Sequence, residues 1–524
     1  MKDLTTSDYA FEDLIQGNFL YVDKTDYIWH LLRPAKELYF LSRPRRFGKS
    51  LLVSTLKAVL QGRKELFRGL AIYDRPYDWK AYPVVHLSFG DYTPMKDTAE
   101  KVDAYLRDKV SAVAETHGVI LPTGCDAATA LGKLLDTLGQ RSQVVVLVDE
   151  YDKPIIDNIG NIGDKQVKGI VTCLKGFYSV LKDRNALERL LFITGVSKFS
   201  HVTLFSDLNN LTDLTLNPEY AGMLGFTEEE VRQSFADWMP DAARAHGVTE
   251  DELMCQVLDW YDGYRFSRGA THVCNPVSIT RFFANGGAFS NYWDSTGTPS
   301  FLLERMSTRN YDHEQALKEW YGESIFSAYE TDRLDITGML WQTGYLTIRG
   351  VRDGVRGLRY QLGFPDREVR DTFCLRLLEY YGNLSLGTGD SLVEKMQNAI
   401  MQDDPDGFLR LFQSVLANID YTLHLRQEKY YQSIFFVVFL LLGSEIAAES
   451  CTNQGRIDAY ICSNSCVYIF EFKLDKTAEE AVGQIKDRRY FEKFMHGRLP
   501  IRLIGVNFDS EKGRIDCWQE GTMG

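Results

Sequence analysis

A nine-residue stretch near the start of the chain constrains its fold more than any other segment: Ser42-Arg43-Pro44-Arg45-Arg46-Phe47-Gly48-Lys49-Ser50. An apolar run ends just before this stretch, and a helix-like pattern of apolar residues follows it. A buried strand, a tight loop with Gly-Lys-Ser and a helix form the arrangement that grips the phosphates of a nucleoside triphosphate. The stretch therefore predicts a phosphate-binding loop in an α/β domain with a parallel sheet.

The loop residues have separate expected roles. Backbone N–H groups around Gly48 would point at the β-phosphate. Lys49 would reach the β- and γ-phosphates, and the Ser50 hydroxyl would bind Mg²⁺. Arg45 and Arg46 belong to the same loop and are counted among the candidate nucleotide-binding residues.

One position departs from the general pattern G-x-x-x-x-G-K-[ST]. Arg43 stands where that pattern has its first glycine. A side chain at this position is expected to crowd a site where glycine lets the backbone approach phosphate. An ordinary strand-to-helix turn that happens to contain Gly-Lys-Ser therefore stays open as the alternative.

A second buried strand supplies acidic residues. The apolar, β-branched run Val144 to Val148 ends in Asp149 and Glu150. Carboxylates at the carboxyl end of a central parallel strand suit magnesium chemistry. Asp149 is predicted to hold Mg²⁺, and Glu150 to orient or deprotonate the attacking water. Alternatively, the two acidic residues simply begin a surface loop. The Gly-Lys-Ser loop earlier in the chain makes this interpretation the weaker one.

The run Leu190 to Thr194 predicts a third strand, followed by Gly195-Val196-Ser197-Lys198. Thr194 or Ser197 would sense the γ-phosphate from this strand, although Ser and Thr at strand ends are also common turn formers. Strands alternate with helical patterns up to about residue 200. This alternation predicts a parallel sheet with its ligand at the carboxyl ends of the strands.

The last hundred or so residues contain a second constellation. Asp458 and Glu471 are separated by twelve residues, and Lys473 follows two positions later. The apolar run Val467 to Phe470 predicts a strand that carries Glu471 and Lys473 on one face. A hairpin would bring Asp458 beside them, giving two carboxylates and a lysine for Mg²⁺-dependent hydrolysis of a phosphodiester. A hairpin with a cross-strand ion pair is the alternative.

A helix predicted from Thr477 to Phe494 offers a candidate face for contacting a nucleic-acid backbone, through Gln484, Lys486, Arg488, Arg489 and Lys493. The net charge of the whole chain is −13, so no general attraction to nucleic acid or anionic membrane is expected. The longest apolar candidate, Ile434 to Gly443, is too short to cross a bilayer. Nine cysteines without a Cys-x-x-Cys pair indicate reduced thiols, and we expect a cytoplasmic protein.

Taken together, these motifs resemble a known family. The segments 43–50, 148–154 and 194–200 are similar to those of the bacterial AAA-ATPase-like family. Gly455 to Asp458 and Ile469 to Lys473 resemble the PD-(D/E)xK nuclease-like domain that usually closes such chains. The resemblance covers nearly the whole chain and implies an α/β ATPase, using ATP and Mg²⁺, fused to a restriction-endonuclease-like fold.

The resemblance also implies roles for individual residues. The implied catalytic residues are Glu150, Asp458, Glu471 and Lys473. The implied metal ligands are Ser50, Asp149, Asp458 and Glu471. The expected domains are a P-loop ATPase-like α/β core at 1–200, a helical lid at 201–285, a small helical or winged middle module at 286–375 and a PD-(D/E)xK nuclease-like α/β domain at 376–524.

Two functions are therefore considered. The first is an ATPase fused to a Mg²⁺-dependent nuclease acting on DNA or RNA, with defence or mobile-element control as its setting. The second is a nucleotide-switched module that binds nucleic acid or protein without cutting. The intact set of Asp458, Glu471 and Lys473 favours the first, whereas Arg43 and the nearly neutral C-terminal region favour the second. The sequence does not indicate the oligomeric state.

Overall fold

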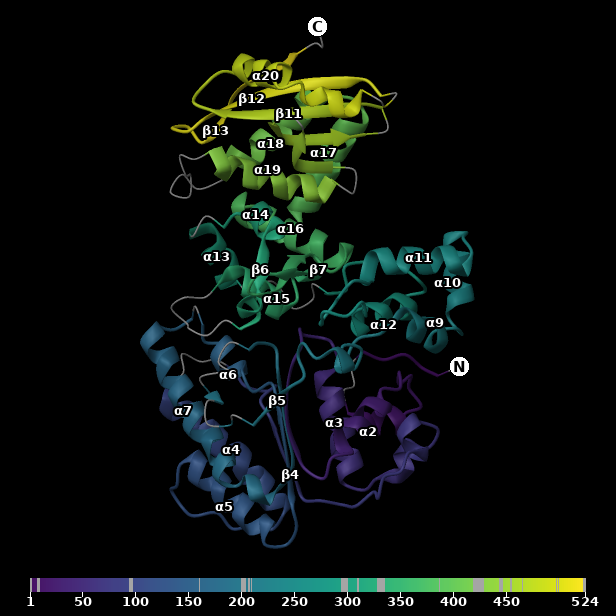
Figure 1. Ribbon diagram of the computed structural model, residues 1–524, viewed down its shortest axis with the longest axis vertical. Coiled ribbons are helices and arrows are strands. Elements are labelled where there is room, and N and C mark those ends of the chain that lie inside the picture. Colours follow the sequence, from purple (N-terminus) through teal and green to yellow (C-terminus); the bar gives the residue numbers. More distant parts are fainter. Residues whose placement is uncertain are drawn as a thin grey trace. The chain divides into compact units, whose positions relative to one another are not determined.

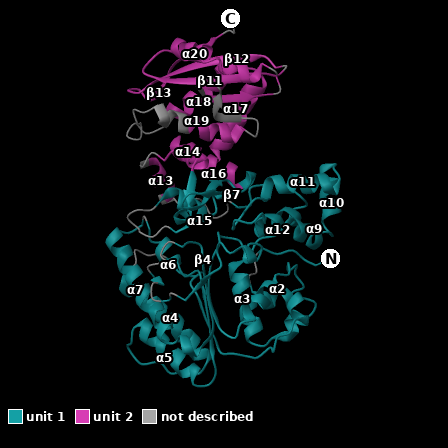
Figure 2. Cartoon of the chain, in the orientation of Figure 1, with its two compact units in different colours: residues 1–293, 320–368 teal, residues 294–319, 369–524 magenta. Residues whose placement is uncertain are grey.

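The structure, a computed structural model, describes residues 2–6, 10–93, 98–159, 161–198, 204–205, 208, 210–293, 300–308, 311–327, 335–385, 387–417, 428–442, 446–452, 455–463, 465–495, 497 and 499–521. The chain forms two compact units (Figure 2). The first unit contains residues 1–293 and 320–368, and the second contains 294–319 and 369–524. The segment 286–375 contributes to both units, because its strands pair within the first unit while its helices at 300–308 and 313–318 belong to the second.

The first unit is built on a five-stranded parallel sheet with the order β2-β3-β4-β1-β5. Its strands are β1 (Glu37–Ser42), β2 (Val84–Ser88), β3 (Val144–Asp149), β4 (Glu188–Gly195) and β5 (Thr212–Asp213). Every residue of β3 and β4 is buried, as expected of strands covered on both faces. Because β4 lies between β1 and β3, the strand ends that carry the three predicted motifs are neighbours at one edge of the sheet.

Helices cover both faces of this sheet (Figure 1). On one face lie α4 (Ala99–Thr116), α5 (Ala127–Gly139) and α7 (Asp164–Asp183), and on the other lie α2 (Thr25–Leu32) and α3 (Lys49–Leu60). Two short helices, α1 (Phe11–Gln16) and α6 (Lys153–Ile156), complete this part. Each long helix buries apolar residues at three- and four-residue spacing, which in α7 are Val167, Ile170, Leu174, Phe177 and Leu181.

Four helices in the region predicted to form a lid, together with a small sheet, complete the first unit. The helices are α9 (Glu228–Ser234), α10 (Met239–His246), α11 (Glu250–Tyr261) and α12 (Pro276–Ala284). The Asn275 side chain accepts hydrogen bonds from the N–H groups of Val277 and Ser278 and so caps the N-terminus of α12. The antiparallel sheet β6-β8-β7 packs with α15, and its bounds are β6 (Trp320–Gly322), α15 (Ile336–Thr343), β7 (Thr347–Gly354) and β8 (Gly357–Gly363).

The second unit contains a mixed five-stranded sheet with the order β13-β12-β11-β10-β9. Its strands are β9 (Ile446–Thr452), β10 (Gly455–Cys462), β11 (Val467–Leu474), β12 (Ile501–Asp509) and β13 (Arg514–Gly521). Its helices are α13 (Ser300–Thr308), α14 (His313–Lys318), α16 (Arg367–Tyr381), α17 (Thr388–Met401), α18 (Pro405–Ala417), α19 (Glu428–Leu442) and α20 (Ala478–Asp487). The helix expected up to Phe494 ends at Asp487, because Arg489 adopts a left-handed conformation with φ 49°.

The side chains of β11 alternate between two apolar layers. Val467 and Ile469 pack with Ile485 of α20, whereas Phe470 and Phe472 pack with Phe435 of α19. Glu471 and Lys473 follow Val467 and Ile469 at odd positions, so they lie on the α20 face. The sheet is therefore covered on both sides, and the two charged residues share the side of α20.

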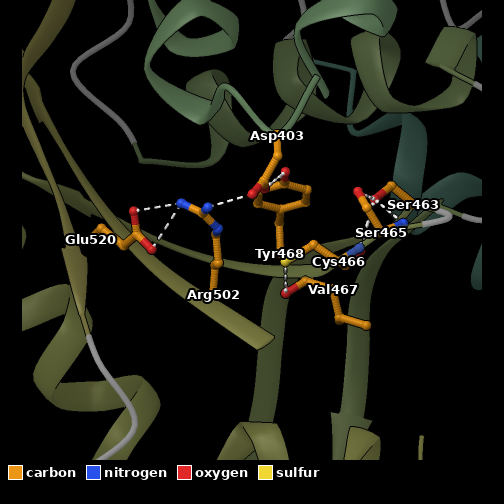
Figure 3. Close-up of polar contacts among 8 residues, drawn as sticks. All are labelled: Asp403, Ser463, Ser465, Cys466, Val467, Tyr468, Arg502 and Glu520. Carbon is orange, nitrogen blue, oxygen red and sulfur yellow. Dashed lines mark hydrogen bonds and ion pairs between the residues drawn. The ribbon is translucent and has the colours of Figure 1, made fainter. Parts of the chain in front are cut away.

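A polar cluster joins the start of β11 to the turn between α17 and α18 (Figure 3). The Tyr468 hydroxyl donates to one carboxylate oxygen of Asp403, and Arg502 donates to the other. Arg502 also pairs with Glu520 of β13 at 3.1 Å. These contacts hold the helical layer at one end of β11, while Glu471 and Lys473 come near the opposite end of the strand.

Among the described residues, the structure contains no helix whose length and apolar character would let it cross a membrane.

Candidate functional site

The loop predicted to bind phosphate leads from β1 into α3, as its sequence indicates. Gly48 precedes the first residue of α3 with φ 85°, a left-handed conformation that favours glycine. The Lys49 side chain is 6 % exposed and donates from Nζ to the carbonyls of Arg43 at 3.0 Å and Pro44 at 2.8 Å. Burial lowers the pKa of Lys49, while Asp149 opposes this shift. The ammonium group thus lies inside the curve of its own loop.

The predicted acidic residues stand at the neighbouring strand ends. Asp149 ends β3, is 3 % exposed and accepts a hydrogen bond from Ser50. Burial raises its pKa, and the Ser50 contact and Lys49 oppose the rise. Its Oδ1 and the hydroxyl of the fully buried Thr194 have no hydrogen-bond partner. Buried polar atoms without partners are costly and require an explanation. Two such atoms beside the predicted phosphate-binding loop favour a polar ligand at this site.

Glu150 follows Asp149 directly and has a positive φ of 56°. Its side chain is half-buried, and Oε2 lies 3.4 Å from the position that a Cβ atom on Gly90 would occupy. The carboxylate therefore lies beside the loop that follows β2. A non-glycine residue in this backbone region is uncommon and often marks a functional site.

Arg43 does not crowd the loop, so the expectation from the missing glycine is wrong. Its side chain is 1 % exposed and donates from Nη1 to the carbonyls of Ser42 at 2.9 Å and Thr215 at 2.7 Å. The guanidinium lies 4.3 Å from the ring centre of Phe266, and burial lowers its pKa to about 9. Arg43 thus turns away from the phosphate side and joins β1 to the segment after β5.

The loop also contacts the segment between α11 and α12 and the region of the small sheet. Phe47 packs edge-on against Tyr264 and Phe266, with ring centres 4.7 and 5.2 Å away. A Cβ atom on Gly344, which follows α15, would lie 2.6 Å from Pro44. These contacts within the first unit hold the loop in place, and the sequence did not indicate this role of Phe47.

Arg45 and Arg46 have different surroundings. Arg45 is exposed, with Nη2 3.9 Å from Asp157. Arg46 donates to the Tyr292 carbonyl at 2.6 Å and contributes to the electrostatic environment of the fully buried Glu368. Of the two arginines, Arg45 is the one open to solvent beside the loop.

Glu368 is a buried carboxylate that sequence reasoning did not identify. Its carboxylate accepts a 2.7 Å hydrogen bond from the Ser278 hydroxyl of α12 and another of 2.7 Å from the Trp293 N–H. Burial raises its pKa to about 7, while Ser278, Trp293 and Arg46 oppose the shift. Glu368 lies far from Arg46 in the sequence, and no spacing pattern connects the two.

Asp152 ties the ends of β3 and β4 together. Its carboxylate accepts hydrogen bonds from the Ser197 N–H at 2.6 Å, the Ser197 hydroxyl at 2.7 Å and the Val196 N–H at 3.1 Å. The Tyr151 hydroxyl donates to the Ser197 carbonyl at 2.9 Å. Because the Ser197 hydroxyl is bound to Asp152, Thr194 remains the candidate for sensing a γ-phosphate.

Gly195→Ala is expected to destabilise the first unit by about 1–3 kcal/mol, the usual cost of overpacking a filled interior. The new Cβ would lie 2.5 Å from the Tyr151 ring and 2.6 Å from Asp152 Oδ1. Gly176→Ala in α7 is the control, because nothing lies within 4 Å of its Cβ position. This change should stabilise the helix by about 0.5–1 kcal/mol. Denaturant unfolding measures both effects, and equal stability of the two variants would contradict this packing.

A pocket of about 400 Å³ adjoins the Tyr292 region, to which Arg46 also binds. The pocket lies between the N-terminal residues and α12, and its lining residues are Leu4, Thr5, Thr6, Thr280, Arg281, Ala284, Asn285 and Tyr292. Its volume is in the range of small-molecule pockets.

The second predicted constellation assembles within the second unit. β10 and β11 pair antiparallel up to Ala459 opposite Phe470, so Asp458 lies one residue beyond the last pair, in register with Glu471. Asp458 Oδ2 accepts the Phe472 N–H at 2.8 Å. Lys473 Nζ lies 3.1 Å from Glu471 Oε1, and Glu471 is 1 % exposed. The structure therefore brings the two carboxylates and the lysine together where β10 and β11 stop pairing.

Gln484 adds a contact that the sequence did not indicate. This α20 residue, expected to face a nucleic-acid backbone, instead donates its amide to Glu471 Oε1. Lys493 lies over the Tyr460 ring at 4.9 Å. In the described part of the chain, no group of three or more His, Cys, Asp and Glu side chains forms a metal site. Two carboxylates still fit Mg²⁺, which commonly keeps several waters and takes one or two protein carboxylates.

Comparison with known proteins gives two matches to families and one to a full-length relative. Residues 7–205 match the family described as predicted AAA-ATPase, and residues 426–518 match the PD-(D/E)XK nuclease superfamily. The chain is also 33 % identical over 532 residues to an uncharacterized protein in the vnfD 5′ region of Azotobacter chroococcum mcd 1. That alignment covers 98 % of each protein.

Proposed function

We propose a function from the premise that the chain belongs to the predicted AAA-ATPase family and ends in a domain of the PD-(D/E)XK nuclease superfamily. The first unit binds and hydrolyses ATP, and the second cleaves a phosphodiester of DNA or RNA with a divalent metal ion. We assign the protein to the cytoplasm, where the free thiols of its described cysteines would persist. As its biological role we consider defence or the control of mobile elements.

In the first unit, the N–H groups of the loop and of the start of α3 bind the β-phosphate. Lys49 exchanges the carbonyls of its own loop for β- and γ-phosphate oxygens. Ser50 and Asp149 would hold Mg²⁺, which neutralises charge on the phosphates. Glu150 orients or deprotonates the attacking water, and the unpartnered Thr194 hydroxyl supplies a contact to the γ-phosphate.

We place the nucleoside part of the ligand in the pocket lined by Tyr292, because Arg46 of the loop donates a hydrogen bond to the Tyr292 carbonyl. The pocket beside Tyr292 is large enough for a nucleoside and offers threonine hydroxyls and an asparagine amide. Arg45 is open to solvent beside the phosphate side of the loop. These features support ATP as the ligand, together with the matched family.

In the second unit, Asp458 and Glu471 would hold Mg²⁺, which supplies an activated water and polarises the phosphate. Lys473 lies next to Glu471 and stabilises the negative charge that develops on the phosphate during cleavage. Gln484 orients the Glu471 carboxylate from α20. The observation that carries the nuclease assignment is the convergence of Asp458, Glu471 and Lys473 where two strands part.

The proposal is tested by incubating the full chain with labelled single- and double-stranded DNA and RNA, with Mg²⁺ or Mn²⁺, and with or without ATP. Cleavage that requires the metal, together with release of phosphate from ATP, is the expected result. Binding of nucleic acid without cleavage in any condition would favour the nucleotide-switched binding module instead.

A further inference from the structure

The small sheet of the first unit has one open face that is rich in arginine. We define the arginine face as Trp320, Arg352, Arg356 and Arg359. Arg352 of β7 stands directly opposite Arg359 of β8, so both side chains lie on the same face. The Arg352 guanidinium lies 4.1 Å from the ring centre of Trp320 in β6. Arg356 is exposed in the turn between the two strands.

The other face of this sheet belongs to the core of the unit. Ile348, Tyr360 and Leu362 are buried, and Tyr360 packs edge-on against Phe326 at 4.8 Å. The neighbouring helix α15 is buried from Ile336 to Gln342, so it does not present a surface to a groove of nucleic acid. The hairpin of β7 and β8 is therefore the element available for contact with nucleic acid.

The arginines of this face repel one another electrostatically, and the packing of the hairpin does not explain why they are there. Like charges directly opposite each other destabilise a pair of strands. Within the described chain, no carboxylate forms an ion pair with Arg352, Arg356 or Arg359. The hairpin from 347 to 363 contains four arginines and one aspartate, a net charge of +3, in a chain whose net charge is −13. A local cationic surface of this kind complements a polyanion.

Two glycines of β7 let the side chains of the arginine face lie close to the backbone. A Cβ on Gly350 would lie 3.0 Å from the Trp320 ring, and one on Gly354 would lie 2.8 Å from Arg359 Cγ. The tryptophan and the arginine stem therefore lie close against the backbone. Such a surface, with cations beside an aromatic ring, is the combination that nucleic-acid-binding proteins use.

We propose that the arginine face binds the sugar-phosphate backbone of nucleic acid. The choice of nucleic acid among polyanions rests on the proposed function, whereas the location of the surface rests on the hairpin itself. Arg352, Arg356 and Arg359 contact phosphates, and the Arg352–Trp320 stack supports a base or sugar. The surface is a binding site in the first unit, separate from the carboxylates of the second.

The test measures binding of short fluorescent single-stranded DNA, double-stranded DNA and single-stranded RNA by anisotropy. It uses the full chain in EDTA, so that no metal-dependent cleavage interferes. The triple variant R352Q/R356Q/R359Q should bind at least about 10-fold more weakly. The slope of log affinity against log salt should fall by about two to three, because each lost phosphate contact removes about 0.7–0.9 from that slope.

Two single variants make the result specific. R356Q changes an exposed residue of the turn, and it should lower the salt slope by about one. R68Q removes another exposed arginine of the first unit and should leave affinity and slope unchanged.

Unchanged affinity in the triple variant would overturn the proposal, as would a wild-type chain that binds none of the three nucleic acids. Competition by polyglutamate as strong as that by unlabelled nucleic acid would overturn the choice of ligand. ATP binding and hydrolysis are measured without nucleic acid, so a failure of this surface and a failure of the ATPase assignment remain distinguishable.

Discussion

Lys49→Ala is expected to weaken binding of ATP–Mg²⁺ by about 100-fold, which corresponds to the loss of one or two charge-assisted hydrogen bonds. The Lys49 ammonium is buried within the loop, and no other lysine of the loop replaces it. Glu150→Gln should leave the affinity nearly unchanged and remove turnover, because the amide fills the same space but does not accept the proton of water. Calorimetry with ATP–Mg²⁺ and a phosphate-release assay measure the two effects.

Lys57→Ala is the matched control for the first of these changes. Lys57 lies in the last turn of the same helix, α3, and its removal alters the net charge equally. This variant should bind ATP like the wild type. Melting temperatures of all three variants show whether the loop change acts through unfolding. Equal ATP affinity in the wild type and in a folded Lys49→Ala variant would contradict the proposed phosphate site.

The arrangement of the proposed phosphate site was predictable because each of its parts is local in the sequence. Gly48, Lys49 and Ser50 are adjacent in sequence, and Asp149 follows an apolar run that reads as a buried strand. The order β3-β4-β1 then brings these strand ends together, as parallel α/β sheets do. The contribution of Arg43 was not predictable, because its partner Thr215 is remote in sequence and its burial depends on tertiary packing.

The difference between local features, which the sequence predicts, and tertiary contacts, which it does not, also applies to the second unit and to Glu368. Alternation along β11 correctly placed Glu471 and Lys473 on one face, since that property follows from strand geometry alone. The contact from Gln484 depends on how α20 crosses the sheet, and the surroundings of Glu368 depend on the tertiary packing of α12. The hydrophobic periodicity of the sequence predicts neither the Gln484 contact nor the surroundings of Glu368.

Asp458→Asn and Glu471→Gln are expected to abolish metal-dependent cleavage while the protein stays folded. Each amide keeps an oxygen that can accept the existing hydrogen bonds from Phe472, Lys473 or Gln484. Each also removes a negative ligand from a site that has two, and Mg²⁺ requires such carboxylate oxygens. Glu479→Gln, in the exposed first turn of α20, changes the net charge equally and should cleave like the wild type.

Lys473→Ala separates metal binding from chemistry at the same site. The lysine is not a metal ligand in the proposal, so Mn²⁺ affinity measured by calorimetry should be retained. Cleavage should slow by about 100-fold, the usual effect of losing one preorganised group that stabilises developing charge. Loss of metal affinity in this variant would instead mean that Lys473 mainly orders Glu471, its partner at 3.1 Å. Wild-type cleavage rates in Asp458→Asn would exclude the site altogether, because no second ligand pair in the proposal replaces that carboxylate.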